Sequence, residues 1–273
     1  MATTSEEDTS EWGVRFAMVS DTGTERSDNE DACGSYIESP SHVLVAVADG
    51  VSGEQGGEIA SRTAVDVTMR AYKESSASWG ALKRLYRAAQ QANIEIHDRA
   101  MVVTELRGMS TTLTAVVVEG GLAYAAHVGD SRLYLIRGDT IVQKTKDHTV
   151  AGGRRRLRLL SAERARAHPD RSVLTRSVGR ELIAAVDRIT FPLAGGDTLL
   201  ICSDGLYNVL DDEELRETVF GKDASQACHD LIATANARRT GDNLTVAIVH
   251  VSGPPAEAPA PGLLGMLSRL VGR

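Results

Sequence analysis

The chain has 273 residues, of which 42% are hydrophobic and 25% are charged, as is usual for a soluble globular domain. Its formal net charge of -7 argues against general binding to nucleic acid. The three cysteines, Cys33, Cys202 and Cys228, are odd in number and far apart, which indicates reduced thiols in a cytoplasmic protein.

The N-terminal residues 1–11 are small, polar and acidic. They lack the basic head and apolar core of a signal peptide, so we predict a disordered tail. Residues 12–252 have no break in composition and are expected to form one domain. Within it, residues 14–19 alternate as a strand does, and the loop at 21–32 is acidic but contains Arg26. Such a loop suits a site for both metal and phosphate, and the alternative is a solvated polar loop.

Six apolar residues at 43–48 predict a buried strand, because strands covered on both faces read as continuous hydrophobic runs. The run ends in Asp49-Gly50, and a helical pattern follows from residue 57. An acid at the tip of a buried strand, beside backbone that bends freely, is well placed to hold a hard cation. Taken alone, Asp-Gly is also a common turn signal.

The middle of the chain alternates between helical and strand patterns. Helices are predicted at 58–72 and 79–101, and strands at 111–118, 122–128, 133–136 and 141–143. Residues 128–132 read Val-Gly-Asp-Ser-Arg, which alone indicates a hairpin connection and makes Asp130 a further acid at a strand junction. We interpret His97 and His127 as packing residues, since no ligand shares the helical face of His97 and strand alternation points His127 away from Asp130.

The Asp-Gly arrangement recurs later in the chain. An apolar run at 197–203 ends in Asp204-Gly205, and Asp242 stands just before the apolar run 244–249. In an antiparallel pair, the end of one strand lies beside the start of its neighbour, so these acids and Asp49 can converge on one edge of a sheet. Crowded carboxylates raise each other's pKa, and a divalent cation removes that penalty. Because all of these candidate ligands are oxygen donors, they favour Mg²⁺ or Mn²⁺ over zinc.

Residues 144–180 form the least regular part of the sequence and are unusually basic. The arginines stand at positions 154, 155, 156, 158, 164, 166, 171 and 176. One interpretation is a solvated helical face. The other is an electrostatic guide for phosphorylated or acidic segments of a partner.

The C-terminal part begins with a capping-box spacing at 211–214, so these acids are interpreted as structural. A helix is predicted at 224–238. Residues 253–273 comprise a proline-rich linker and a short amphipathic segment, which is too short to span a membrane. Docking on a partner, contact with a membrane surface and a frayed tail all remain open for this segment.

Several motifs occur in a fixed order along the chain. They are Arg26 to Asp31 (R-x-x-N-E-D), Asp49-Gly50, Gly57 to Ser61 (G-E-I-A-S), Gly108 to Leu113 (G-M-S-T-T-L), Val128 to Arg132 (V-G-D-S-R), Lys146 to Thr149 (K-D-H-T), Val173 to Arg176 (V-L-T-R), Ser203 to Gly205 (S-D-G) and Gly241 to Thr245 (G-D-N-L-T). The ordered set resembles the metal-dependent serine/threonine protein phosphatases of the PPM (type 2C) family, in their bacterial form. The resemblance covers about residues 12–251 and implies an α+β fold, a four-layer α/β/β/α sandwich of two antiparallel sheets flanked by helices.

The resemblance also implies the metal ligands. Asp49 would bridge two Mn²⁺ or Mg²⁺ ions, and the Gly50 carbonyl would bind one of them. Asp204 and Asp242 would be the remaining protein ligands of the other ion. Asp130 would share a third, weaker ion with Asp204.

The remaining roles concern water and phosphate. Glu30 and Asp31 would hold metal-bound waters, and Arg26 would bind the substrate phosphate. The implied mechanism is one-step hydrolysis, in which a water bridging two cations attacks phosphorus in line. One departure is Glu54, where family members of this type usually have histidine, together with Ser52 in place of a glycine. A glutamate protonates a leaving group only if its pKa is raised, so we expect slower turnover or a shifted pH optimum.

The expected substrates are phosphorylated proteins, including those of a serine/threonine kinase and the kinase itself. We expect a cytoplasmic monomer without a transmembrane segment. No cysteine lies in a C-x₅-R phosphate loop, which disfavours the thiol phosphatases. The alternatives are a pseudophosphatase that binds phosphoproteins with weak turnover and a phosphoesterase acting on small phosphates or nucleic acid. The complete set of acids disfavours the first, and the net charge and ordered motifs disfavour the second.

Overall fold

The structure is a computed structural model that describes residues 11–51 and 56–254. The predictions about the tail at 1–11 and the segment at 253–273 fall almost wholly outside these residues, as do those about Ser52 and Glu54. None of the helices in the described part of the chain is long and apolar enough to cross a membrane.

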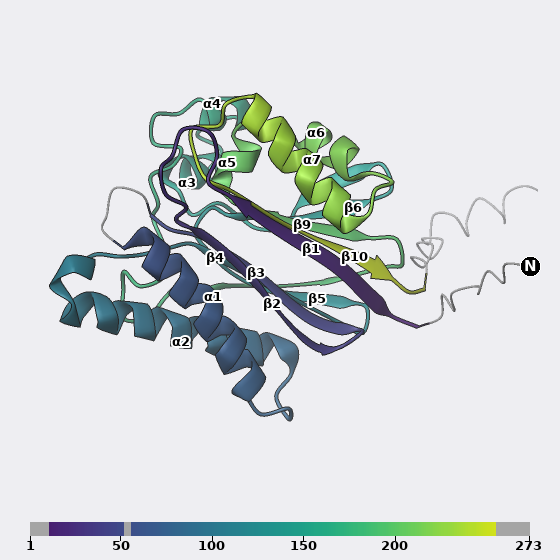
Figure 1. Ribbon diagram of the computed structural model, residues 1–273, viewed down its shortest axis with the longest axis horizontal. Coiled ribbons are helices and arrows are strands. Elements are labelled where there is room, and N and C mark those ends of the chain that lie inside the picture. The colour runs from purple at the N-terminus through teal and green to yellow at the C-terminus, as the bar shows by residue number, and fades with distance from the viewer. Residues whose placement is uncertain (1–10, 52–55, 255–273) are drawn as a thin grey trace, which may run out of the picture.

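Two five-stranded antiparallel sheets pack face to face in the centre of the molecule (Figure 1). The strand order of the first sheet is β1 (Gly13–Asp21), β10 (Leu244–Ser252), β9 (Thr198–Cys202), β6 (Arg132–Arg137) and β7 (Thr140–Gln143). The order of the second sheet is β2 (Asp31–Ser39), β3 (His42–Asp49), β4 (Leu113–Glu119), β5 (Leu122–Val128) and β8 (Asp187–Pro192). The strand patterns in the sequence predicted all of these except β2 and β8.

Helices cover the outer face of each sheet, which confirms the four-layer α/β/β/α sandwich (Figure 1). The second sheet is covered by α1 (Gly57–Glu74) and α2 (Ala81–Val102), which is followed by a 3₁₀ turn, η1 (Thr104–Leu106). The first sheet is covered by α5 (Asp204–Tyr207), α6 (Asp212–Val219) and α7 (Ala224–Ala237). The basic region 144–180, called the flap below, contains α3 (Val150–Arg156) and α4 (Ala162–Arg166).

Strand β3 is buried on both faces, which explains its continuous apolar run. Val45 and Val47 face the core between the two sheets, whereas Leu44 and Ala46 face the core beneath α1 and α2. All four side chains are at most 1% exposed. Packing on both sides therefore fixes the end of this strand, where Asp49 stands.

The hairpin interpretation of residues 128–132 is wrong. Strand β5 pairs with β4 and β8 in the second sheet, whereas β6 pairs with β9 and β7 in the first. The segment therefore crosses from one sheet to the other. Gly129 has a φ of 106°, and a Cβ there would lie 2.5 Å from Cγ2 of Thr112. The turn residues signal a change of direction but do not specify the sheet that the chain enters.

The acids also do not share one edge of a single sheet, as the sequence suggested. Asp49 ends β3 in the second sheet, while Asp204 follows β9 and Asp242 precedes β10 in the first. Asp204 is moreover the first residue of α5. The acids meet because the corresponding ends of two stacked sheets face each other across the sandwich.

Candidate active site

Hydrogen bonds join the two sheets at the acidic end of the sandwich. In the second sheet, the pairing of β2 with β3 places Asp31 directly opposite Asp49. In the first, the Ser203 hydroxyl accepts a hydrogen bond from the Thr245 amide (2.9 Å) and donates one to Oδ2 of Asp31 (2.7 Å). Ser203 thus connects the acids of one sheet to the strand ends of the other. The sequence analysis gave no role to this serine, although it precedes the Asp-Gly pair.

The backbone around Asp49 is held in place from several directions. Its amide donates to Oγ1 of Thr112 (2.9 Å), and the amide of Gly50 donates to the carbonyl of Glu30 (3.0 Å). A Cβ at Gly50 would lie 2.4 Å from the carbonyl oxygen of Gly57, so no larger residue fits without moving backbone. This close approach brings the start of α1 to the same place as the tip of β3.

Asn243 anchors the acidic N-terminal loop to the start of β10. Its buried side chain donates to the carbonyls of Thr22 and Asp28, both at 2.9 Å, and accepts from the amide of Glu30 at 2.9 Å. The sequence placed this asparagine in a motif without assigning it a function. The motif was the only signal in the sequence, because the burial that obliges an amide side chain to find partners is visible in the structure alone.

Arg26 lies against the acid that the resemblance assigns to metal binding. Its guanidinium forms an ion pair with Oδ1 of Asp242 at 2.9 Å, and its Nε donates to the carbonyl of Gly241 at 3.1 Å. About a third of each side chain in the ion pair is exposed, 36% for Arg26 and 34% for Asp242. The structure therefore brings Arg26 to the acidic cluster, with its fork directed at a carboxylate.

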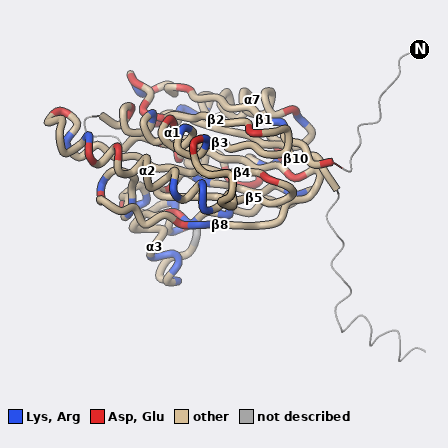
Figure 2. The backbone as a smooth tube through the Cα atoms, turned by 90° about the horizontal axis from the view of Figure 1, so that it is seen from below, with Lys and Arg blue, Asp and Glu red and all other residues tan. Residues whose placement is uncertain are grey.

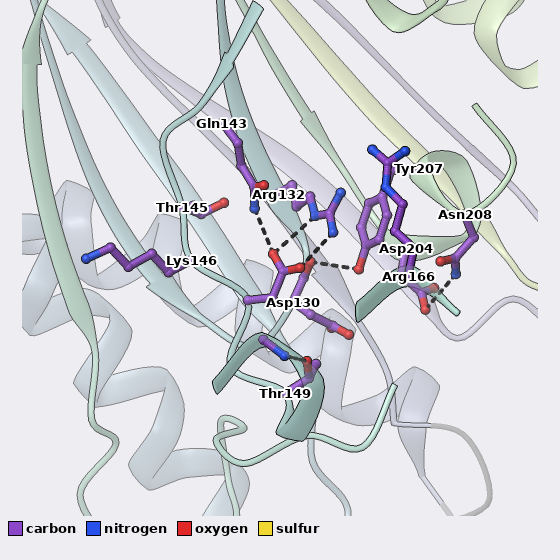
Figure 3. A network of polar contacts seen from close by, with 12 residues as sticks. Asp130, Arg132, Gln143, Thr145, Lys146, Thr149, Arg166, Asp204, Tyr207 and Asn208 are labelled. Carbon is purple, nitrogen blue, oxygen red and sulfur yellow. Dashed lines mark hydrogen bonds and ion pairs between the residues drawn. The ribbon is translucent and has the colours of Figure 1, made fainter. Parts of the chain in front are cut away.

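A network of polar contacts supports Asp130 and joins it to α5 (Figure 3). The Tyr207 hydroxyl donates to the carbonyl of Asp130 at 3.1 Å. The Arg132 guanidinium lies 3.5 Å from the centroid of the Tyr207 ring and donates twice to Asp147, at 2.7 and 3.1 Å. Because α5 begins at Asp204, this network ties the position of Asp130 to that of Asp204. Sequence patterns pointed to Asp130 but not to the tyrosine that holds it.

Burial, followed by mutual repulsion, dominates the electrostatics of these acids. Burial, followed by the charges of Asp31 and Asp204, holds the pKa of Asp49 well above its usual range. Burial likewise raises the pKa of Asp31 to about 7 and of Asp204 to about 6, and the charge of Asp242 contributes to both. For Asp130, burial and then the charge of Asp204 raise the pKa well above its ordinary value. Five carboxylates therefore lie within electrostatic reach of one another.

The donors at this end of the sandwich fit a hard divalent cation. They are carboxylates and backbone carbonyls, without histidine or cysteine, which suits Mg²⁺ or Mn²⁺. Across the part of the chain that the structure describes, no group of three or more His, Cys, Asp or Glu side chains is arranged closely enough to hold a metal ion by itself. Such cations keep several water ligands, so a cluster that supplies few protein ligands per ion is suitable. A cation would also favour the ionised carboxylates and so counteract the burial and repulsion that raise these pKa values.

The candidate residues set aside by the sequence analysis are structural here as well. His127 is fully buried and forms hydrogen bonds with Oγ1 of Thr114 (2.9 Å) and the carbonyl of Lys146 (3.1 Å). The three cysteines are free thiols, as predicted. Their pKa values are raised by burial, which suppresses the reactive thiolate form.

Comparison with known proteins identifies the family. The sequence matches the protein phosphatase 2C family over residues 24–244. The chain belongs to this family. It is 36% identical to the serine/threonine phosphatase stp of Listeria innocua over 234 residues, which are 84% of this chain and 93% of the relative.

Solved structures agree with this assignment. The serine/threonine phosphatase PstP/Ppp of Mycobacterium tuberculosis superposes with a TM-score of 0.79 at 30% identity, covering 87% of this chain and 98% of that one. The PstP catalytic domain in complex with two manganese ions has a TM-score of 0.78 at 29% identity, covering 88% and 99%. The bacterial protein phosphatase 2C assignment and fold class that the sequence predicted are confirmed.

Proposed function

We propose that this chain is a metal-dependent protein phosphatase that hydrolyses phosphoserine and phosphothreonine in proteins, with Mn²⁺ or Mg²⁺ as cofactor. The observation that carries the proposal is the cluster of carboxylates from both sheets in a chain of the protein phosphatase 2C family. Relatives named as serine/threonine phosphatases and the two manganese ions of PstP support the activity and the cofactor.

In this proposal the cluster supplies the ligands. Asp49, the Gly50 carbonyl, Asp204 and Asp242 would together hold two cations, with Asp49 as the ligand that both would share. When bound, the cations neutralise phosphate charge and acidify the attacking water. Asp130, buried and supported from α5, is positioned to share a third ion with Asp204.

Glu30 and Asp31 orient water, and Arg26 binds the phosphate. Asp31 already accepts the Ser203 hydroxyl at 2.7 Å, which fixes the direction of its carboxylate. Arg26 now contacts Asp242 at 2.9 Å. A cation on Asp242 would compensate the charge of this carboxylate, and the Arg26 guanidinium would then be available to phosphate oxygens, which have similar geometry.

The partners are phosphorylated proteins, and a serine/threonine kinase together with its targets is the natural source of them. The free cysteines support a reducing, cytoplasmic location. We expect a monomer. A pseudophosphatase is not favoured, because every predicted metal acid is present, and the acids that burial places together repel one another without a cation.

The test is hydrolysis of a phosphothreonine peptide by wild type, Asp204→Asn and the control Asp139→Asn, which removes an equal charge from an exposed turn. We expect no turnover in EDTA and turnover with added Mn²⁺ in wild type and control. Loss of a metal ligand should lower kcat on the order of a hundredfold or more. A wild type that binds the peptide and Mn²⁺ but does not release phosphate would contradict the proposal and favour the pseudophosphatase.

A further inference from the structure

A cavity of about 470 Å³ lies between the flap and helices α5 and α6, directly beside the carboxylate cluster. Asp204 and Asn208 form its wall on the side of the cluster. On the flap side, Arg155, Arg166 and Arg171 line it. A substrate held at Asp204 would therefore extend past three guanidinium groups.

The carboxylates of the cavity wall other than Asp204 are already engaged. Asp147 accepts two hydrogen bonds from Arg132, at 2.7 and 3.1 Å. Glu214 pairs with Arg238 at 2.6 Å, and Asp211 caps α6 through the Glu214 amide. These acids are therefore compensated within the protein and do not balance the flap arginines.

The flap arginines that line the cavity form few ion pairs within the protein. The side chains of Arg155 and Arg171 are exposed and form no hydrogen bond or ion pair with the residues described by the structure. Arg166 pairs with the exposed Asp212 at 3.3 Å, a contact that solvent weakens.

Other flap arginines serve the flap itself. Arg154 contacts His168 at 2.6 Å, Arg156 donates to the carbonyl of Asp147 at 3.0 Å, and Arg176 pairs with Asp187 at 2.9 Å. The flap therefore contains arginines with structural contacts that are distinct from the arginines lining the cavity. Figure 2 shows basic positions on α3, which projects from the body of the sandwich.

We propose that this cavity binds a second anionic group of the substrate, a phosphate or carboxylate side chain within a few residues of the phosphoserine or phosphothreonine being hydrolysed. Guanidinium groups bind such anions through paired hydrogen bonds. The inference rests on the proposed function, because the first phosphate must occupy the cluster at Asp204. The preferred substrates are then acidic or multiply phosphorylated segments.

The test compares peptides of one sequence that carry a single phosphothreonine, a phosphothreonine with a second phosphoserine, or a phosphothreonine with a glutamate at that second position. The second position is moved from one to about four residues away on either side, since an extended chain advances about 3.3 Å per residue. The proteins are wild type, the double variant Arg155→Ala/Arg171→Ala, and Arg164→Ala. Arg164 is an exposed α4 arginine outside the cavity lining, so its variant is the matched control.

At about 50 mM salt we expect kcat/KM to be about tenfold higher for the best doubly phosphorylated peptide, since two exposed charge pairs contribute a few-fold each. A glutamate should give a smaller gain. The preference should disappear in the double variant, persist in Arg164→Ala, and weaken at about 500 mM salt. Hydrolysis of a small aryl phosphate should be equal in all three proteins.

The outcomes separate this inference from the proposed function. Hydrolysis of all peptides at equal kcat/KM by wild type overturns the second anion site and leaves the phosphatase intact. A preference that survives in the double variant also overturns it. If no peptide is hydrolysed, the proposed function fails. Fluorescence anisotropy then measures the affinities of the same peptides, which test the second anion site independently of turnover. Equal affinities for singly and doubly phosphorylated peptides would then refute it.

Discussion

Replacing Asp31 by asparagine should stabilise the metal-free protein while impairing its function. Burial and neighbouring acids raise the pKa of Asp31 from 3.8 to about 7. Because one pKa unit corresponds to about 1.4 kcal/mol, the ionised carboxylate costs up to about 4 kcal/mol above pH 7. The acids share this repulsion and the site relaxes, so we expect about 2 kcal/mol to be regained. Asparagine still offers an oxygen to the Ser203 hydroxyl.

The sign of the pH dependence follows from the raised pKa. Well below its unfolded pKa of 3.8, Asp31 is protonated in both states and costs nothing, whereas the penalty grows as the pH rises through 3.8 and is complete above about pH 7. In urea unfolding with EDTA, the free energy of unfolding of Asp31→Asn should therefore rise relative to that of wild type between about pH 5 and pH 8. Added Mn²⁺ should stabilise wild type more than the variant. The exposed Asp66→Asn is the charge control. If wild type and Asp31→Asn had equal free energies of unfolding both at about pH 5 and at about pH 8, the electrostatic reasoning would be refuted.

Two further substitutions test the packing around the site and the core. A Cβ on Gly205 would lie 2.1 Å from the carbonyl oxygen of Asn243. Gly205→Ala should therefore lower both the melting temperature and the Mn²⁺-dependent turnover. The control is Gly80→Ala, where the added Cβ meets open space, and it should leave both quantities unchanged. Arg84 is 5% exposed and forms an ion pair with Glu38 at 2.9 Å. Arg84→Met should therefore lower the free energy of unfolding in urea by about 2 kcal/mol, because it leaves Glu38 without its partner. A change within about 0.5 kcal/mol of zero would show that the remaining Glu38 is fully solvated.

Much of the fold was predictable because its strands and helices carry strong periodic signals. The apolar run of β3, the helical segment of α1 and the capping box at Asp211 all appear as predicted. Strand β2 was missed because it contains Gly34 and polar residues and only its first residue, Asp31, is buried. A half-exposed strand at the edge of a sheet lacks the hydrophobic contrast that makes β3 recognisable.

The acids that the structure brings together were predicted from the sequence, but their mutual arrangement was not. Sequence motifs supplied Asp49, Asp204 and Asp242, because an acid beside glycine at a strand end is a local signal. The crossing of residues 128–132 between sheets is a long-range property, and so is the ion pair of Arg26 with Asp242. Neither follows from spacing, since both depend on how separately predicted strands stack.

The pairing of β2 with β3 makes this carboxylate cluster costly to fold. Placing Asp31 opposite Asp49 in adjacent strands forces two buried acids together, and Ser203 with Thr245 offsets only part of the cost through hydrogen bonds. A protein that kept these acids without binding a cation would bear an uncompensated penalty, and their replacement by amides would be favoured. Retention of all of them together in one chain is therefore a physical argument for metal binding that is independent of resemblance.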